Sequence, residues 1–316
     1  MSKITAINKL QLAQEATLGT PDTLDIQPNG IDVKFSPKVE VEQIKTKSGS
    51  TMPALYSFVK KRWGEGEFSG YLDYNRAMLW FDGMFGYDAS SPHTYLSSPD
   101  WVDESPKGLT AAFGQTGAIY TASGILPYSL KISANAGEPW NFVYSWFSLD
   151  PVADGGSFEA LSTDVPELVH GYETALYMDE DLDATIGTTA RADVAFSFEA
   201  NITADHKPVW HLGDQAPDSY RSGVWGGSLK LVLEADATAV DSIGDILDAA
   251  DTGKGFTIRL QATDGTNTLK LDFCGVCVAP PNLLSDTDGI VSYELNLVPQ
   301  VNDTYGGCWG AELTIA

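Results

Sequence analysis

Two short stretches of the sequence determine the predicted fold: residues 31–36, which read IDVKFS, and residues 192–197, which read ADVAFS. Both alternate apolar and polar side chains and share the pattern Asp-Val-x-Phe-Ser, which indicates half-buried β-strands. A glycine-led strand pattern follows each of them, at residues 66–73 and 226–233, and a short helical pattern comes next. Matching elements lie about 160 residues apart, so we predict two copies of one β-rich unit. Repeated units often build larger assemblies.

The remaining patterns divide the chain into an arm, two units and a connector. Residues 1–30 predict an extended arm, punctuated by Gly-Thr-Pro and Pro-Asn-Gly. The first unit covers residues 31–165, and residues 88–125, rich in Ser, Pro, Gly and Thr, form an insertion or a long hairpin within it. Residues 166–190 form an acidic connector, and the second unit covers residues 191–316.

Apolar residues recur mostly with a period of two, so we predict a mainly β protein with one short helix in each unit. The helix at residues 75–86 is apolar nearly all round and ends at Gly86, which predicts a covered helix. The second helix is predicted at residues 241–250. Asp264-Gly265 predicts a hairpin turn. Further strands are predicted at residues 126–132, 140–149, 194–202, 228–233, 256–262, 269–278, 293–298 and 312–315.

The first long strand pattern contains two features that predict interruptions. Residues 31–44 alternate well, but Pro37 predicts an interruption of this strand. Residues 56–74 predict paired strands, and residues 63–66 (WGEG) predict a turn or a bulge within them.

Charge separates the two halves and argues against a protein that grips nucleic acid. The formal net charge is −24; residues 1–150 hold 12 basic and 16 acidic residues, whereas residues 151–316 hold 7 and 27. Nucleic-acid binding requires a basic footprint. The acidic excess serves solubility, and it also suits a surface that nucleic acid passes without binding.

The sequence predicts synthesis in a reducing compartment, without a membrane segment. No apolar core of a signal peptide stands at the N-terminus, and no run approaches the roughly 18 apolar residues of a membrane span. Three cysteines are an odd number, which fits the cytosol.

We predict no catalytic, metal or cofactor site. Cys274 and Cys277 form a C-x-x-C pattern inside a strand, where positions three apart point to opposite faces, so we interpret them as structural. Cys308 and four histidines lack metal-ligand spacing. The acidic run at residues 179–183 lacks the glycine and distal glutamate of a calcium loop and indicates a solvated face. The histidines are His93, His170, His206 and His211.

One basic cluster stands out in this acidic chain. Lys60, Lys61 and Arg62 are consecutive, and Lys45 and Lys47 lie nearby in the sequence. We interpret the cluster as an assembly surface that complements acidic residues on a neighbouring copy.

Several patterns together carry a family resemblance. They are the QEATLGTP opening at residues 14–21, the strand at 33–44, the Ser-Gly-Ser loop at 48–50, the run from GEGEFSGYL (64–72) to LWFDGMFG (79–86), and YELNLVP at 293–299. Over most of its length, the chain resembles the tail tube proteins (major tail proteins) of long-tailed bacteriophages. The insertion at residues 88–125 and the weak match between the halves depart from the family pattern.

The resemblance implies a fold and an assembly. Each unit would be a β-sandwich or partial barrel with one flanking helix, and the units would join into a ring with a continuous inner β-barrel. Rings would stack through loops and arms, and the acidic lumen would conduct DNA from capsid to host. Tape measure, tail terminator and tip proteins would be partners in the virion tail, and the chain would be made in the bacterial host cytoplasm. By position, the inter-ring loop would consist of Ile44, Lys45, Thr46, Lys47, Ser48, Gly49, Ser50, Thr51, Met52 and Pro53.

Two ring compositions follow from this reading. If both halves are tube units, three chains form a pseudo-sixfold ring; if only one half lines the tube, six chains are needed. We favour three because the duplication supplies two units per chain. Ring closure would also consume the open strand edges that otherwise pair without control.

Two other functions remain open from the sequence. A β-sandwich module that binds carbohydrate or another ligand would use exposed aromatic side chains, with Trp101, Trp210, Trp225 and Trp309 as candidates. A β-rich hydrolase would need converging carboxylates, and no pair is singled out among the 43 acidic residues. The sequence does not separate a phage tail from a related injection machine.

Overall fold

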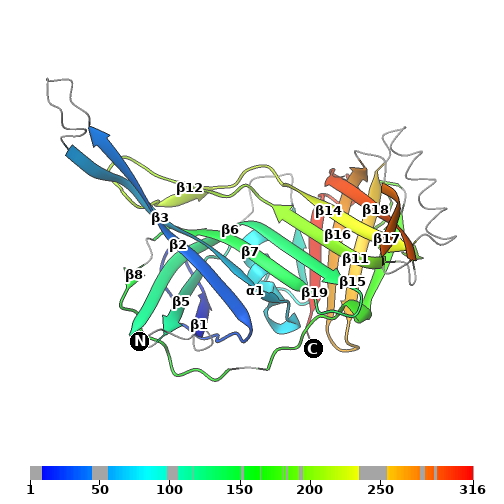
Figure 1. The fold of residues 1–316 in the computed structure, drawn as a ribbon, viewed down its shortest axis with the longest axis horizontal. Coiled ribbons are helices and arrows are strands. Elements are labelled where there is room, and N and C mark those ends of the chain that lie inside the picture. The colour runs from blue at the N-terminus through cyan, green and yellow to red at the C-terminus, as the bar shows by residue number, and fades with distance from the viewer. Residues whose placement is uncertain are drawn as a thin grey trace.

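A computed structural model shows a mainly β chain with one α-helix in the part that it describes (Figure 1). The described residues are 9–44, 56–97, 106–115, 117–150, 153–163, 165–179, 181–182, 184–191, 195–234, 255–277, 282–287 and 290–315. The elements are β1 (Lys9–Gln14), β2 (Ile31–Ile44), β3 (Tyr56–Tyr71), α1 (Tyr74–Phe85), β4 (His93–Leu96), β5 (Leu109–Gln115), β6 (Ala118–Asn135), β7 (Asn141–Ser148), β8 (Ala153–Asp154), the 3-10 helix η2 (Gly171–Glu173), β9 (Thr174–Asp179), β10 (Ala190–Arg191), β11 (Ala195–Thr203), β12 (Lys207–Val209), β13 (Ser219–Arg221), β14 (Gly226–Glu234), β15 (Phe256–Thr263), β16 (Thr268–Cys277), β17 (Asn282–Thr287), β18 (Ile290–Pro299) and β19 (Trp309–Thr314).

One long antiparallel sheet runs through both halves of the chain. Its eight strands follow the order β2–β3–β7–β6–β11–β14–β18–β17. The first four strands come from the first half and the last four from the second. In Figure 1, this main sheet extends from the blue β2 on the left to the brown β17 on the right.

A second set of strands packs against the main sheet in each half. In the first half, β1 pairs with β5, and β5 pairs with the beginning of β6. In the second half, the pairing order is β10–β9–β15–β16–β19–β4. β6 and β16 each connect the two sets, because the end of each strand pairs within the main sheet, with β7 and with β18 respectively.

This pairing repeats, although the matching letters do not superpose. β5, β6 and β7 pair in the same manner as β15, the β16–β17 segment and β18. Phe35 lies in regular register opposite Gly66, whereas Phe196 falls where β11 shifts register between Ala195 and Ser197. The duplication therefore lies in the order of pairing. Residues 192–194 are outside the described residues.

A single apolar core joins the two halves. Trp140 of the first half packs edge-on against Phe198 of the second, with ring centroids 4.8 Å apart. Both side chains belong to one buried cluster that continues through the main sheet. Burial of this continuous surface stabilises the halves as one body.

The helix prediction for the first half is confirmed to within one residue. The Asp73 side chain accepts a hydrogen bond from the backbone N–H of Asn75 (2.9 Å) at the start of α1, and Gly86 ends the helix with φ +112°. Trp80 stacks on Phe142 at 4.7 Å, so the helix is covered by the sheet. The helix predicted at residues 241–250 lies outside the described residues.

The interruptions predicted in the first strand pair are wrong, because β2 and β3 run straight through Pro37 and residues 63–66. Pro37 is accommodated because, among the described residues, β2 pairs with β3 alone, and an edge strand tolerates the missing N–H. Gly66 lies under the ring of Trp146, which a Cβ would overlap. The register shift occurs instead between Glu40 and Val41.

Segments predicted as arm, insertion and connector contribute strands to the fold. Residues 9–30 do not extend away from the body: β1 pairs with β5, and Leu10 and Leu12 are buried. Residues 88–125 hold β4, β5 and the start of β6, and β4 pairs with β19 of the second half. Residues 166–190 hold β9, which pairs with β15.

Candidate assembly surfaces

The junction between the halves is an ordinary strand pair within the main sheet. β6 and β11 pair from Ser129 opposite Thr203 to Asn135 opposite Ser197. The Ser129 hydroxyl donates to Asn201 Oδ1 at 3.0 Å, across the same boundary. The two halves are thus joined edge to edge as if they were separate subunits of one larger sheet.

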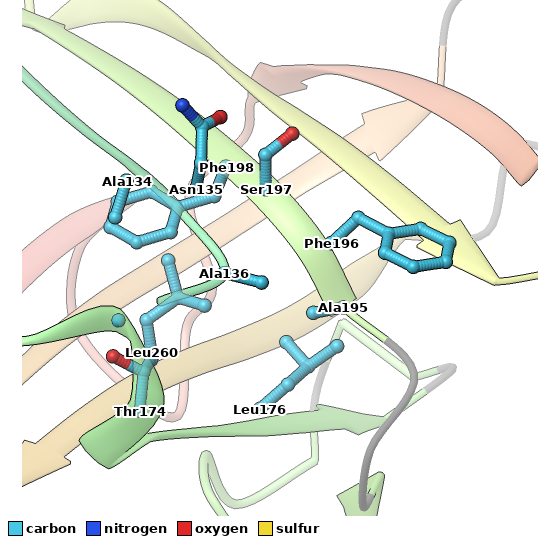
Figure 2. A pocket seen from close by; sticks show the side chains of 11 residues that line it. Ala134, Asn135, Ala136, Thr174, Leu176, Ala195, Phe196, Ser197, Phe198 and Leu260 are labelled. Carbon is cyan, nitrogen blue, oxygen red and sulfur yellow. The ribbon is translucent and has the colours of Figure 1, made fainter. Parts of the chain in front are cut away.

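A small hollow lies at one end of this junction (Figure 2). Leu176 of β9 and Leu260 of β15 lie there beside residues 134–136 and 195–198. None of the residues that line it is charged. A ligand site would need polar groups that converge on the ligand, so the hollow is a packing feature of the junction.

The two ends of the main sheet have open edges. Within the described part of the chain, β2 pairs only with β3, and β17 pairs only with β18. The two edges lie at opposite sides of the molecule in Figure 1. Unpaired edges are templates for pairing with another chain.

The main sheet has one apolar face, which is buried in the core, and one polar face. Cross-strand partners share a side, so the polar face can be followed strand by strand. Its side chains include Asp32, Lys34, Glu67, Ser69, Ser129, Lys131, Ser133, Asn141, Ser145, Glu199, Asn201, Ser228, Lys230, Glu234, Glu294 and Asn296.

The far ends of β2 and β3 form a hairpin that projects from the body (Figure 1). We call residues 38–44 and 56–62 the projecting hairpin. Five of its apolar side chains are 36–61% exposed, and Tyr56 stacks on Phe58 at 6.1 Å. Grouped exposed apolar side chains indicate an interaction surface. The exposed set is Val39, Val41, Ile44, Tyr56 and Phe58.

The predicted inter-ring loop begins at the tip of this hairpin. Ile44 is the last residue of β2 and is half exposed. Residues 45–53, the rest of the predicted loop, lie outside the described residues.

The basic cluster lies at the base of the hairpin, where contacts within the chain engage it. Lys60 Nζ lies 3.2 Å from Glu40 Oε1 and 3.8 Å from Glu42 Oε2. Lys61 Nζ lies 4.1 Å above the ring of Trp210. The side chain of Arg62 is exposed.

Residues 204–225, between β11 and β14, occupy the place in the second half that the projecting hairpin occupies in the first. We call them the folded-back connection. The Arg62 N–H donates to the Gln215 carbonyl at 2.8 Å, and the Gln215 amide donates to the Val59 carbonyl at 3.2 Å. Trp210 packs edge-on against Trp63 at 5.4 Å. This connection therefore braces the base of the projecting hairpin.

The structure assigns a role to the QE pair of the opening, which sequence reasoning missed. Glu15 is fully buried; Oε1 accepts from the Gly124 N–H (2.7 Å) and the Thr110 hydroxyl (2.9 Å), and Oε2 accepts from the Gly19 N–H (2.7 Å). Burial raises the pKa of this carboxyl, and these three hydrogen bonds oppose the rise. Gln14 donates to Asp82 Oδ2 at 2.6 Å, on α1. The signal in the sequence that could have revealed this role is a charged residue directly after an apolar strand.

The described residues show no arrangement typical of a reactive or metal-binding site. The three cysteines are buried and form no disulfide in the described part of the chain, and burial raises the pKa of the Cys274 thiol to about 12. A thiol of such high pKa is a poor nucleophile. No group of three His, Cys, Asp or Glu side chains in the described part could hold a metal ion. His206 is buried with Nδ1 2.8 Å from the Pro127 carbonyl oxygen.

The tryptophans proposed for ligand binding are engaged elsewhere. Trp309 is fully buried and donates to the Gly226 carbonyl at 3.0 Å. Trp225 stacks on Phe85 at 5.0 Å, and Trp210 belongs to the brace described above. Trp101 lies outside the described residues.

In the described part, no helix is long and apolar enough to cross a membrane.

A long sheet with two open edges, an internal edge-to-edge junction and a projecting apolar hairpin define a subunit of a β-sheet assembly. The sequence model of the phage tail tube protein family matches residues 5–299, and the chain belongs to this family. It is therefore a structural component of the virion tail, whose copies stack into a tube. A comparison with curated proteins finds no match.

Proposed function

We propose that this protein assembles itself into stacked hollow rings and that the resulting tube conducts DNA from the capsid to the host. The observation that carries the proposal is the β6–β11 junction, where two like units already join edge to edge in one sheet. A sheet that continues across units can close on itself if each unit adds the same rotation.

The pairing geometry supports a ring of three chains. The free edge of β17 corresponds to the β6 edge of the junction, and the free edge of β2 corresponds to the β11 edge. Pairing β17 of one chain with β2 of the next would repeat the internal junction and leave no open edge. A six-chain ring would need the second half outside the tube, whereas its strands continue the same sheet as the first half.

Stacking would use the projecting hairpin and the loop at residues 44–53. Among the described residues, one hairpin projects from the chain, because the corresponding connection of the second half is folded back onto β3. A ring of three would therefore send three hairpins toward the next ring. Tape measure, terminator and tip proteins would bind the finished tube, and assembly would begin in the host cytoplasm.

The polar face of the main sheet would line the lumen. It has to face solvent, since the opposite face is buried in the core. An acidic lining repels phosphate only over a Debye length of roughly 8 Å, which permits DNA to slide.

Negative-stain electron microscopy of the concentrated, purified chain tests the proposal. We expect hollow rings or tubes. Compact single particles that stay unassembled with tail tips added as nuclei, and that bind glycans on an array, would favour the carbohydrate-binding alternative instead.

A further inference from the structure

Outside the projecting hairpin, the polar face of the described main sheet contains three lysines, which ought to bind passing phosphates. Each of them has a carboxylate partner on a neighbouring strand. Lys34 Nζ lies 2.9 Å from Glu67 Oε1 across the β2–β3 boundary. The other two pairs are Lys131 with Glu199 (2.8 Å) and Lys230 with Glu294 (2.9 Å).

The three pairs are distributed along the whole sheet. One lies inside the first half, the Lys131–Glu199 pair spans the β6–β11 junction, and the Lys230–Glu294 pair lies inside the second half. Every pair joins two adjacent strands, so each also contributes a favourable cross-strand contact, whereas like charges in these positions would repel.

These glutamates also neutralise the charge of the lysines. A lysine that contacts DNA phosphate releases condensed counterions, and several such contacts hold a duplex firmly at low salt. A carboxylate about 3 Å from the ammonium group already neutralises it. Asp32 and Glu234 add further negative charge to the same face.

We propose that Glu67, Glu199 and Glu294 are built-in counterions that mask the three lysines, so that a duplex polyanion moves past this face without binding. The masking itself is a property of the single chain. Only the identification of the passing duplex as DNA in the lumen rests on the proposed function.

The test removes the three carboxylates and leaves the lysines. The probe is a fluorescein-labelled DNA duplex of about 20 base pairs, titrated with the full-length, unassembled chain at several NaCl concentrations. For the triple variant Glu67→Gln, Glu199→Gln and Glu294→Gln, we expect affinity at least about tenfold above wild type at low salt. The log–log salt slope should approach about −2.7 if all three lysines contact phosphate.

Two control variants separate masking from a general charge effect. Adding Lys34→Gln, Lys131→Gln and Lys230→Gln to the triple variant should return binding to the wild-type level. Asp25→Asn, Glu159→Gln and Asp214→Asn change the net charge equally at exposed sites outside the strands of the main sheet and should leave binding unchanged. If the triple variant does not fold by circular dichroism, Glu199→Gln alone, with and without Lys131→Gln, gives the same comparison.

Equal DNA affinity for the triple variant and the control variant with substitutions away from this face would overturn the proposal. That result would leave the tube intact as a conclusion, because tube formation is read from micrographs of the wild-type chain. Absent tubes together with lysine-dependent DNA binding would instead refute the tube and retain the masking.

Discussion

The projecting hairpin and the folded-back connection occupy the same place in the two halves, yet they behave differently. The projecting hairpin carries exposed Val39, Val41 and Tyr56 away from the body. The folded-back connection turns onto β3, where Trp210 and Gln215 contact the base of that hairpin. One of these two connections is exposed, and the other supports its base.

This difference implies that the two units can have different roles in a pseudo-symmetric ring. In the part of the chain that the structure describes, each half supplies four strands to the main sheet. Contacts between rings would come from the first unit alone.

The largest effect is expected for a charge placed on the projecting hairpin. Val41→Asp should reduce tube yield more than about tenfold, since burial of an unpaired carboxylate at a ring-to-ring contact is strongly unfavourable. Val41 is 52% exposed in the single chain, so the melting temperature should hardly change. Sedimentation of assembled tubes measures the yield.

The matched control places the same charge on the folded-back connection. Val224 is 79% exposed there, and Val224→Asp should assemble normally. Equal loss of tubes in both variants would remove the distinction between the two connections.

A substitution in the core tests whether the two halves unfold as one unit. Trp140→Ala removes a fully buried ring that packs on Phe198 across the junction, and should lower the free energy of unfolding by about 3–5 kcal/mol. Urea unfolding followed by fluorescence and by circular dichroism should show one shifted transition. Two separated transitions, with only one of them shifted, would show that the halves unfold independently.

The buried carboxylate of Glu15 anchors the segment after β1 through three hydrogen bonds, and it has no counterpart among the described residues of the second half. Glu15→Gln turns an amide NH2 toward at least one of the three donors that Glu15 accepts from, and should cost about 1–3 kcal/mol of unfolding free energy. Glu159→Gln, an exposed change of the same type, should cost almost nothing.

The cost of Glu15→Gln should depend on pH in a defined direction. The pKa of Glu15 is raised in the folded chain, so its stabilising contribution is complete below the ordinary glutamate pKa. That contribution declines as the pH rises through the raised pKa of the folded state. Urea titrations of both proteins between about pH 4 and pH 8 should show the difference shrinking with pH; a growing difference would contradict the assignment.

The smallest effect is expected at the brace. Trp210→Ala removes the edge-on contact with Trp63 and the Lys61–ring contact, which together contribute about 1–2 kcal/mol. The Arg62 amide, bonded to the Gln215 carbonyl, should exchange faster in hydrogen-exchange mass spectrometry. Leu212→Ala in the same connection alters a fully exposed side chain and should not change this rate. An unchanged rate in Trp210→Ala would mean that the brace does not hold the hairpin.

Local signals in the sequence predicted the elements that local physics fixes. The helix before Gly86 and the hairpin at Asp264-Gly265 formed as expected; Asp264 Oδ1 accepts from the Thr266 and Asn267 N–H groups at 2.7 Å. Capping and turn chemistry involve residues a few positions apart, so they are visible in the sequence.

Features that depend on distant partners could not be predicted in the same way. Gly66 resembled a turn residue, but its role is to leave room for Trp146 of β7. The pairing of β4 with β19 joins residues more than 200 positions apart, and the contacts of Lys61 with Trp210 span the two halves. The strand pattern predicted the paired strands of the hairpin, whereas the contacts of Glu15 and of the brace depend on the fold.

The central claim, that the internal junction is repeated between chains, is tested most directly by counting chains in a ring. Cryo-electron microscopy of assembled tubes, reconstructed without imposed symmetry, would resolve the number of copies around the axis. We predict three chains per ring, with β17 of each paired to β2 of the next and both units lining the lumen. A ring of six chains, with the second half outside the wall, would contradict it.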